Sequence, residues 1–264
     1  MTRRIRLTVE YDGTAYAGWQ RQLNAVSVQQ RLEEAIKKLT GEGASVTGAS
    51  RTDAGVHALG QVAHFDTVSR IPGDKFCFAL NTVLPDDIRV SASCETRPDF
   101  HARFDAQGKL YRYLIHNHAH ASAIDRNTHA HSIYPLDEEL MHGEAQAAVG
   151  KHDFAAFAAS GSIVKDTVRT IHEARVLRND NEVEFLVRGN GFLYNMVRIL
   201  AGTLMAVGSG KLEPGAIGRA LESKNRLDLG VTAPAHGLTL MRVYYDDDPS
   251  EEDQGADWPF SGLL

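Results

Sequence analysis

The feature that most constrains the fold is a series of strand and helix signals that occurs twice in the same order. In residues 5–11 apolar and polar side chains alternate, which is typical of a half-buried strand. A helix with an apolar stripe follows, in which Ser27 and Gln30 form a capping box and Gly41 marks the end. The other signals of this half are a short strand near Val46, a strand at 61–67, a helix at 74–82 and a strand at 88–95.

The second half repeats this order, although no similarity is evident residue by residue. Its signals are a strand at 110–116, a helix at 137–149, strands at 168–177 and 182–189, a helix at 192–207, a short helix from Pro214 and a strand at 238–245. Each half thus has the order β-α-β-β-α-β of ferredoxin-like domains. We predict an α+β protein with two such halves, residues 1–104 and 105–245, whose sheets can join.

The composition indicates a soluble protein with a sizeable core. Hydrophobic residues make up 43% of the chain and charged residues 23%. No apolar run approaches a membrane span, and the N-terminal residues lack an apolar signal core, so we expect no membrane association. Cys77 and Cys94 are too few for a disulfide framework and lack zinc-type spacing. A cytoplasmic protein with reduced thiols is the resulting expectation.

The net charge of −6 is unevenly distributed. Residues 246–264 form an acidic tail with seven Asp and Glu and no Lys or Arg, so residues 1–245 alone carry a formal charge of +1. An acidic protein is an unfavourable partner for nucleic acid, but a nearly neutral body allows a local basic groove. The charge therefore permits an RNA partner without indicating one.

A lone carboxylate in the loop "GASRTDAGVHALG" is the first candidate for chemistry. Asp53 can serve as a nucleophile, as a general base, or as a turn residue, and turns are its commonest setting. Arg51 lies two residues before it and would hold the carboxylate ionised. The small residues around Asp53 leave space for a flat ligand. The loop thus suggests a site but not its reaction.

Two segments combine aromatic with basic or amide side chains, as RNA-binding surfaces do. The first, "YDGTAYAGWQRQ", contains Trp19 and Arg21, but its aromatics are more simply explained as core residues. The second, residues 98–114, contains His101, Arg103 and Tyr111. A strand with one buried and one solvated face explains this second segment equally well.

One charge stands in an otherwise apolar helix. Arg198 lies early in "GFLYNMVRILAGTLMAVG". Such an arginine is usually paired, either in a structural ion pair or with a functional carboxylate. Spacing along the sequence does not choose between these partners.

Cofactor motifs are missing from the sequence. Five histidines crowd residues 116–131, but no cysteine or carboxylate completes a metal site with them. There is no glycine-rich phosphate loop, no G-x-S-x-G and no H-E-x-x-H. We expect no metal and no nucleotide cofactor.

Taken together, five segments resemble, in order, those of the tRNA pseudouridine synthase A family. They are "YDGTAYAGWQRQ", "ASRTDAGVHALGQVAHF", "DFHARFDAQGKLYRY", "GFLYNMVRILAG" and "APAHGLTLMRVYY", and they extend from about Ile5 to Tyr245. The family pattern has glycine where this chain has Ser50. If the backbone at this position had a positive φ, serine would cost about 1 kcal/mol.

The resemblance implies two ferredoxin-like halves that share an antiparallel sheet with a central cleft, in a homodimer. It also implies conversion of uridine to pseudouridine at positions 38, 39 and 40 of the tRNA anticodon stem-loop, without metal or cofactor. In this reaction the N1–C1′ bond breaks, the uracil turns, and C5 bonds to C1′. Because a stacked base hides C1′, the uridine must be flipped out of the helix.

The same resemblance implies roles for individual residues. Asp53 would be the nucleophile, attacking either the ribose or the uracil ring, and Arg198 would pair with it. Tyr111 would stack on the uracil and assist removal of the C5 proton. Arg51 would fill the vacated space or hold the flipped phosphate. The expected substrate-binding residues are Arg51, Tyr111, His101, Arg103, Trp19 and Arg21.

Two other functions compete with this hypothesis. The first is a non-catalytic RNA-binding protein, which has no need of an anionic group facing phosphate. The second is an Asp-dependent hydrolase of nucleosides, which lacks a second well-placed acid or a metal cluster in this sequence.

Overall fold

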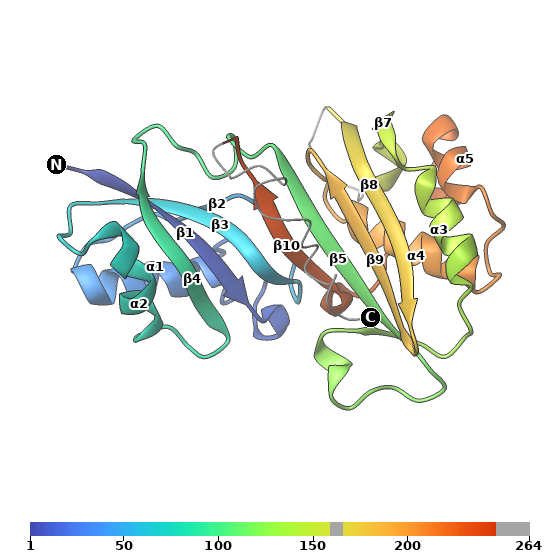
Figure 1. The fold of residues 1–264 in the computed structure, drawn as a ribbon, viewed down its shortest axis with the longest axis horizontal. Coiled ribbons are helices and arrows are strands. Elements are labelled where there is room, and N and C mark those ends of the chain that lie inside the picture. The colour runs from blue at the N-terminus through green and yellow to red at the C-terminus, as the bar shows by residue number, and fades with distance from the viewer. Residues whose placement is uncertain (159–165, 247–264) are drawn as a thin grey trace.

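A single sheet runs through both halves of the molecule (Figure 1). The structure, a computed structural model, describes residues 1–158 and 166–246, and ten strands of these residues form the sheet. The strands are β1 (Arg3–Tyr11), β2 (Thr47–Gly48), β3 (His57–Thr67), β4 (Ile88–Thr96), β5 (Gly108–Asn117), β6 (Ala130–Ser132), β7 (Gly150–Asp153), β8 (Val168–Asn179), β9 (Glu182–Gly189) and β10 (Leu238–Tyr244).

The two halves have the same strand order. In the first half it is β4-β1-β3-β2, and in the second it is β10-β5-β9-β8, with β7 added at the outer edge and β6 paired with β5. In each half the fourth strand of the β-α-β-β-α-β unit lies beside the first, the first beside the third, and the third beside the second. The α+β fold with two ferredoxin-like halves is therefore confirmed, and β6 and β7 are additions that the sequence did not predict.

The halves join through β10, which pairs with strands of both. Thr239 and Leu240 lie parallel to His57 and Ala58 at the start of β3, while the other edge of β10 pairs with β5 in antiparallel fashion. The shared sheet is thus antiparallel within each half, apart from the small addition of β6, but parallel at the joint. This joint places the loop before β3 at the centre of the molecule.

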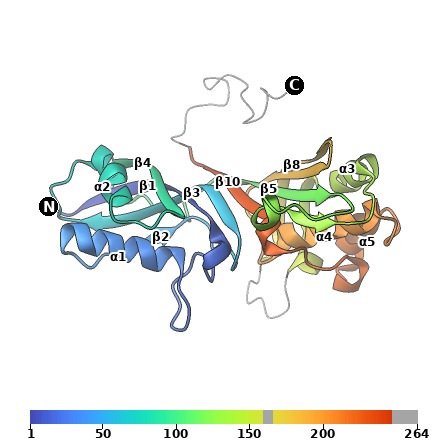
Figure 2. The ribbon, with the colours of Figure 1, turned by 90° about the horizontal axis from the view of Figure 1, so that it is seen from below.

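The helices follow the expected local signals. The first, α1, is capped by Ser27 Oγ, which accepts a hydrogen bond from the Gln30 amide at 3.2 Å, and it ends at Gly41 with a φ of 74°. The helices α1 and α2 lie with the first half and the other three with the second (Figures 1 and 2). They are α1 (Val28–Thr40), α2 (Phe76–Asn81), α3 (Glu138–Gln146), α4 (Met196–Gly208) and α5 (Ala216–Ser223).

One predicted helix begins later than expected. The apolar pattern suggested a start near 192, but α4 starts at Met196 because Asn195 has a left-handed backbone with a φ of 62°. A left-handed residue interrupts the helical hydrogen bonds, so residues 192–195 form a separate turn before the helix. The side chains of this turn line the cavity described below.

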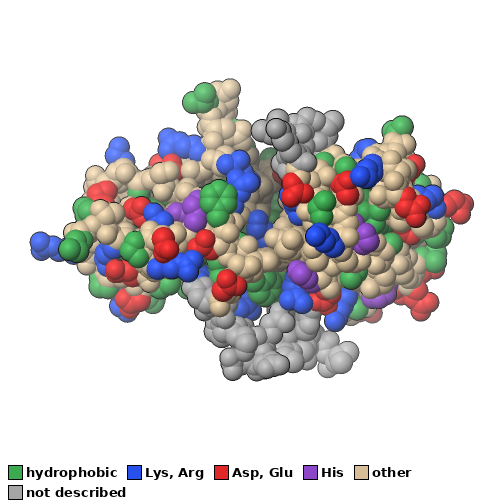
Figure 3. All heavy atoms as spheres, turned by 90° about the horizontal axis from the view of Figure 1, so that it is seen from above, with side chains coloured by type: hydrophobic (Ala, Val, Ile, Leu, Met, Phe, Trp, Pro, Cys, Tyr) green, Lys and Arg blue, Asp and Glu red, His purple; other side chains and the backbone are tan. Residues whose placement is uncertain are grey.

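Basic and acidic side chains are interspersed over the face shown in Figure 3. No helix in the described part of the chain is both long and apolar enough to cross a membrane. The predicted acidic tail lies outside the described residues except for Asp246, whose carboxylate accepts a hydrogen bond from Gln107 at 3.1 Å.

Candidate active site

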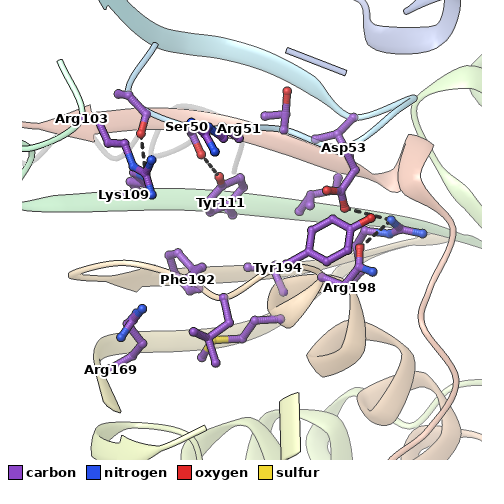
Figure 4. A pocket seen from close by; sticks show the side chains of 18 residues that line it. Ser50, Arg51, Asp53, Arg103, Lys109, Tyr111, Arg169, Phe192, Tyr194 and Arg198 are labelled. Atoms are coloured by element: carbon purple, nitrogen blue, oxygen red, sulfur yellow. Dashed lines mark hydrogen bonds and ion pairs between the residues drawn. The ribbon is translucent and has the colours of Figure 1, made fainter. Parts of the chain in front are cut away.

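A cavity of about 450 Å³ lies where the two halves meet (Figure 4). Most of the described lining comes from three segments, namely the loop 49–56 before β3, the start of β5 with the loop before it, and the turn 192–195 with the first residues of α4; Arg169 of β8 and Leu238 of β10 complete it. This volume is within the range of small-ligand sites. The segments are far apart in the sequence, so the cavity exists only because β10 joins the halves.

Asp53 and Arg198 form an ion pair at one end of the cavity. The Arg198 Nη1 donates to Asp53 Oδ2 at 2.9 Å, and both side chains are more than four-fifths buried. Two further acceptors hold the guanidinium, namely Asn195 Oδ1 and the Ala233 carbonyl, each at 2.9 Å. The charge in the apolar helix thus has a carboxylate partner, and Arg51, the neighbour in sequence, is not that partner.

Burial dominates the electrostatics of Asp53. Desolvation raises the pKa of its carboxyl above the ordinary value, and the hydrogen bond and charge of Arg198 offset this only in part. A carboxylate that loses hydration but keeps one directed cation is more reactive than a solvated one. The site therefore contains a carboxylate suited to nucleophilic or basic chemistry.

Tyr111 lines the middle of the cavity, between Lys109 and Asp53 (Figure 4). Its hydroxyl is 2.7 Å from Ser50 Oγ, and its ring meets Phe192 edge to face with centroids 5.2 Å apart. Burial raises the pKa of Tyr111 to about 12, so the side chain is a neutral phenol at neutral pH. The apolar faces of Tyr111 and Phe192 suit a flat ring, and the phenol is a polar handle beside it.

Ser50 is a structural partner of Tyr111 and is not strained. Its backbone is not among the described residues with positive φ, so the steric cost considered for serine in place of glycine does not arise. Gln61 bonds both the amide and the carbonyl of Ser50, at 3.0 and 2.7 Å.

We expect Ser50→Ala to lower the free energy of unfolding by about 1 kcal/mol, because it removes a buried hydrogen bond and leaves the Tyr111 hydroxyl without its partner. Chemical denaturation measures this change. The control is Ser91→Ala, since Ser91 is exposed and makes a 3.3 Å contact with a carbonyl. Equal effects of the two substitutions would show that the Ser50 bond contributes nothing.

Asn195 combines an unusual backbone with a side-chain contact to the ion pair. Its φ of 62° lies in the left-handed region, which asparagine tolerates better than most residues. This conformation turns Oδ1 toward Arg198 Nη1. Such backbone outliers concentrate at functional sites.

We expect Asn195→Ala to be less stable than Asn195→Gly by about 1 kcal/mol. Both variants lack the amide, so their difference isolates the left-handed backbone, which glycine adopts freely and alanine does not. Thermal or chemical unfolding of the pair tests this. Equal stability would mean that the turn relaxes to an ordinary backbone when Asn195 is replaced.

The other predicted site residues are distributed unevenly. Arg51 and Arg103 line the cavity. His101 lies outside the lining; its Nδ1 accepts the Arg103 amide at 3.2 Å, and its ring stacks on Phe104, so it shapes the loop that carries Arg103. Trp19 is only 1% exposed and packs in the core, as the simpler explanation of its segment had it. Arg21 also lies outside the lining and pairs with Glu33 at 2.6 Å.

Sequence reasoning missed part of the lining. Phe192, Tyr194 and Asn195 lie in the turn that was predicted to be helical, and Arg169 lies near the start of β8. Lys109 is one of several basic residues in the segment 98–114, and it was not among the predicted site residues. Its place two residues before Tyr111, on the same face of β5, is the signal that would have found it.

The histidine-rich segment makes local hydrogen bonds. The His116 Nε2 contacts the His120 carbonyl at 3.1 Å, and the His131 Nε2 contacts the His118 carbonyl at 2.8 Å. Within residues 1–158 and 166–246, no three His, Cys, Asp or Glu side chains are grouped as metal ligands.

The cavity at the junction of the two ferredoxin-like halves contains a buried, cation-paired carboxylate, which makes it a candidate catalytic site. The sequence model of the tRNA pseudouridine synthase family matches residues 7–105 and 145–246. The tRNA pseudouridine synthase A of Acetivibrio thermocellus is 54% identical over 243 residues, which cover 92% of this chain and 100% of that protein. The protein of this name from Clostridium acetobutylicum is 48% identical over 241 residues, 91% of this chain and 99% of that protein.

A more distant likeness exists among solved structures. A chain of a Cbf5–Nop10–Gar1 complex aligns over 91% of this chain and 50% of its own length, with 14% identity and a TM-score of 0.39. The sequence matches settle the classification. This chain belongs to the tRNA pseudouridine synthase family and is an isomerase that acts on tRNA.

Proposed function

We propose that the protein forms pseudouridine at positions 38, 39 and 40 of the tRNA anticodon stem-loop, with Asp53 as the nucleophile. The observation that carries the proposal is the buried Asp53 carboxylate, directed into the cavity and held by Arg198 at 2.9 Å. An RNA-binding surface without catalysis has no use for a buried anion where phosphate approaches. A nucleophile does require one.

The reaction exchanges one glycosidic bond for another. The N1–C1′ bond of uridine breaks, and Asp53 as nucleophile forms a bond to C1′ or to the uracil ring. The uracil turns, C5 bonds to C1′, and the bond to Asp53 breaks, which restores the carboxylate. The C5 proton is lost and N1 gains a proton, so no atoms are added or removed overall. No oxidant, reductant or further reactant is needed.

Base flipping explains the shape of the site. In a stem the ribose C1′ is covered by stacked bases, so Asp53 reaches it only when the uridine leaves the helix. The cavity is large enough for one nucleotide, and Tyr111 with Phe192 offers apolar rings for stacking the uracil. We assign to the exposed Arg51 the contact with the RNA strand beside the flipped nucleotide.

Incubation with an unmodified tRNA transcript tests the function. We expect pseudouridine at positions 38, 39 or 40, wherever the transcript has uridine, and nowhere else. Pseudouridine at other positions would refute the site assignment. Binding without product would favour the RNA-binding alternative, and release of free uracil would favour a hydrolase. The proposed homodimer is tested separately, by sedimentation of the purified chain.

A further inference from the structure

The cavity has far more positive than negative charge. Among the described residues, five cationic side chains line it, namely Arg51, Arg103, Lys109, Arg169 and Arg198, whereas Asp53 is the single acid. Arg198 forms an ion pair with Asp53. No other acid in the described lining is left to neutralise the remaining four cations, and neighbouring cations repel one another unless an anion lies between them.

Lys109 is half-buried, whereas Arg51 and Arg103 are exposed. It precedes Tyr111 by two positions on β5, so both side chains project from one face of the sheet into the cavity. Its Nζ donates to the Ala49 carbonyl at 2.9 Å, which occupies one of three ammonium donors. Among the described residues no carboxylate forms an ion pair with it, and none adds to the charges that shift its pKa.

The surroundings disfavour the charged form of Lys109. Burial, followed by the charges of Arg103 and Arg169, lowers the pKa of Lys109 to about 8. The groups that face it are Arg103 from the loop before β5, Arg169 from β8, the Ala49 carbonyl from the loop after β2, and the neutral Tyr111 phenol. An anion placed among the three cations would reverse this penalty.

Arg103 and Arg169 flank Lys109 from two different elements. In the described chain neither forms an ion pair with a carboxylate: Arg103 lies over the Phe104 ring at 5.9 Å, and the Arg169 Nη1 donates to the Val168 carbonyl at 2.6 Å. Figure 4 shows Arg103, Lys109 and Arg169 toward one end of the cavity, Asp53 and Arg198 toward the other, and Tyr111 between.

We propose that Arg103, Lys109 and Arg169 form a binding site for one backbone phosphate of the tRNA, beside the nucleotide whose base lies on Tyr111. Arginine and lysine are the usual phosphate ligands, and a phosphodiester supplies the anion that the cavity lacks. This inference rests on the proposed entry of the tRNA into the cavity, but not on the role of Asp53. It assigns Lys109 a part in binding that can be switched off by deprotonation.

The coupling between proton and phosphate has a definite sign. A phosphate binds the ammonium form better than the neutral amine, so binding raises the pKa of Lys109. Below the pKa of the free protein the ammonium is present and the Kd for tRNA does not change with pH. As pH rises through that pKa, the free protein loses the proton and the Kd increases.

The test is equilibrium binding of an unmodified tRNA transcript at pH 7 and pH 9. We expect Lys109→Met to raise the Kd at pH 7 by about tenfold, the effect of one charged hydrogen bond. With that coupling, the wild-type Kd rises about fivefold between pH 7 and pH 9. Lys109→Arg keeps its charge, so its Kd should be independent of pH. The control is Lys37→Met, on the exposed side of α1.

A synthetic anticodon stem-loop with single neutral methylphosphonate linkages locates the phosphate. One such linkage should weaken wild-type binding more than binding by Lys109→Met, because the variant has already lost the Lys109 contact and keeps only those of Arg103 and Arg169. Thermal unfolding checks each variant. If Lys109→Met does not fold, the pH dependence of wild type against Lys109→Arg decides the question.

Two results would overturn the proposal. One is a pH-dependent Kd that persists unchanged in Lys109→Arg, and the other is wild-type affinity of a folded Lys109→Met. Asp53→Asn separates this inference from the proposed chemistry, since it should keep the Lys109-dependent binding. Activity of Asp53→Asn would refute the nucleophile alone, whereas either result above would refute the phosphate site alone.

Discussion

Asp53→Asn is expected to reduce the rate of pseudouridine formation by at least about 10³-fold, with little change in the affinity for tRNA. Asparagine has nearly the same shape, and its carbonyl oxygen can still accept a hydrogen bond from Arg198 Nη1. It is neutral, however, and it is a poor nucleophile. The variant therefore removes the proposed chemical step and preserves the cavity.

Single-turnover kinetics and equilibrium binding, measured on the same tRNA transcript, separate these two effects. The matched control is Asp66→Asn, which neutralises an exposed carboxylate bonded to Arg4 at 2.7 Å, outside the cavity. The control should keep wild-type activity. Product formation by Asp53→Asn at the wild-type rate would remove Asp53 from the mechanism.

Arg198→Met is expected to reduce turnover about 10²-fold or more at neutral pH, and the loss should become smaller as pH rises. Burial already raises the pKa of Asp53, and Arg198 is the group that opposes this rise. Without the guanidinium the pKa rises further, so more of the carboxyl is protonated at a given pH. Since the carboxylate is the active form, activity is lost as pH falls through the pKa, and this loss begins at a higher pH in the variant.

The pH dependence of single-turnover rates measures this shift in the pKa of Asp53. The variant for comparison is Arg198→Lys. Arg198→Lys keeps a positive charge, so its profile should move less, although a lysine cannot reach Asp53, Asn195 and the Ala233 carbonyl together. Thermal unfolding must show that both variants fold. A fall in tRNA affinity alone, with an unchanged profile, would contradict the proposed function of the ion pair.

Much of the fold could be predicted because its signals are local. Alternation in β1, the capping of α1 by Ser27 and its end at Gly41 depend on residues within a few positions of one another. The start of α4 was predicted too early because it does not depend on local signals alone. Asn195 has a left-handed backbone and its side chain accepts a hydrogen bond from Arg198, and the apolar pattern carries no sign of either.

The site was only partly predictable. Trp19 had the composition of a stacking residue, yet its burial depends on how the strand end packs. The only sequence signal for Lys109 was its place two residues before Tyr111, and its significance comes from Arg169, sixty positions away on another strand. Chemical type is visible in a sequence, but burial and shared access to one cavity are not.

The amino-acid sequence by itself determined the order of the strands and helices apart from β6 and β7, the loop with its lone carboxylate and, through five segments in succession, the family. The residues alone left the partner of Arg198 open, and Asp53 was expected only from the family resemblance; it is the tertiary structure that brings Arg198, and not the nearby Arg51, to the Asp53 carboxylate. The two residues are 145 positions apart, and they meet because β10 joins the two halves edge to edge. Local patterns follow from covalent spacing, whereas the partner of a charge is decided by packing, which brings distant residues into contact and excludes water from between them.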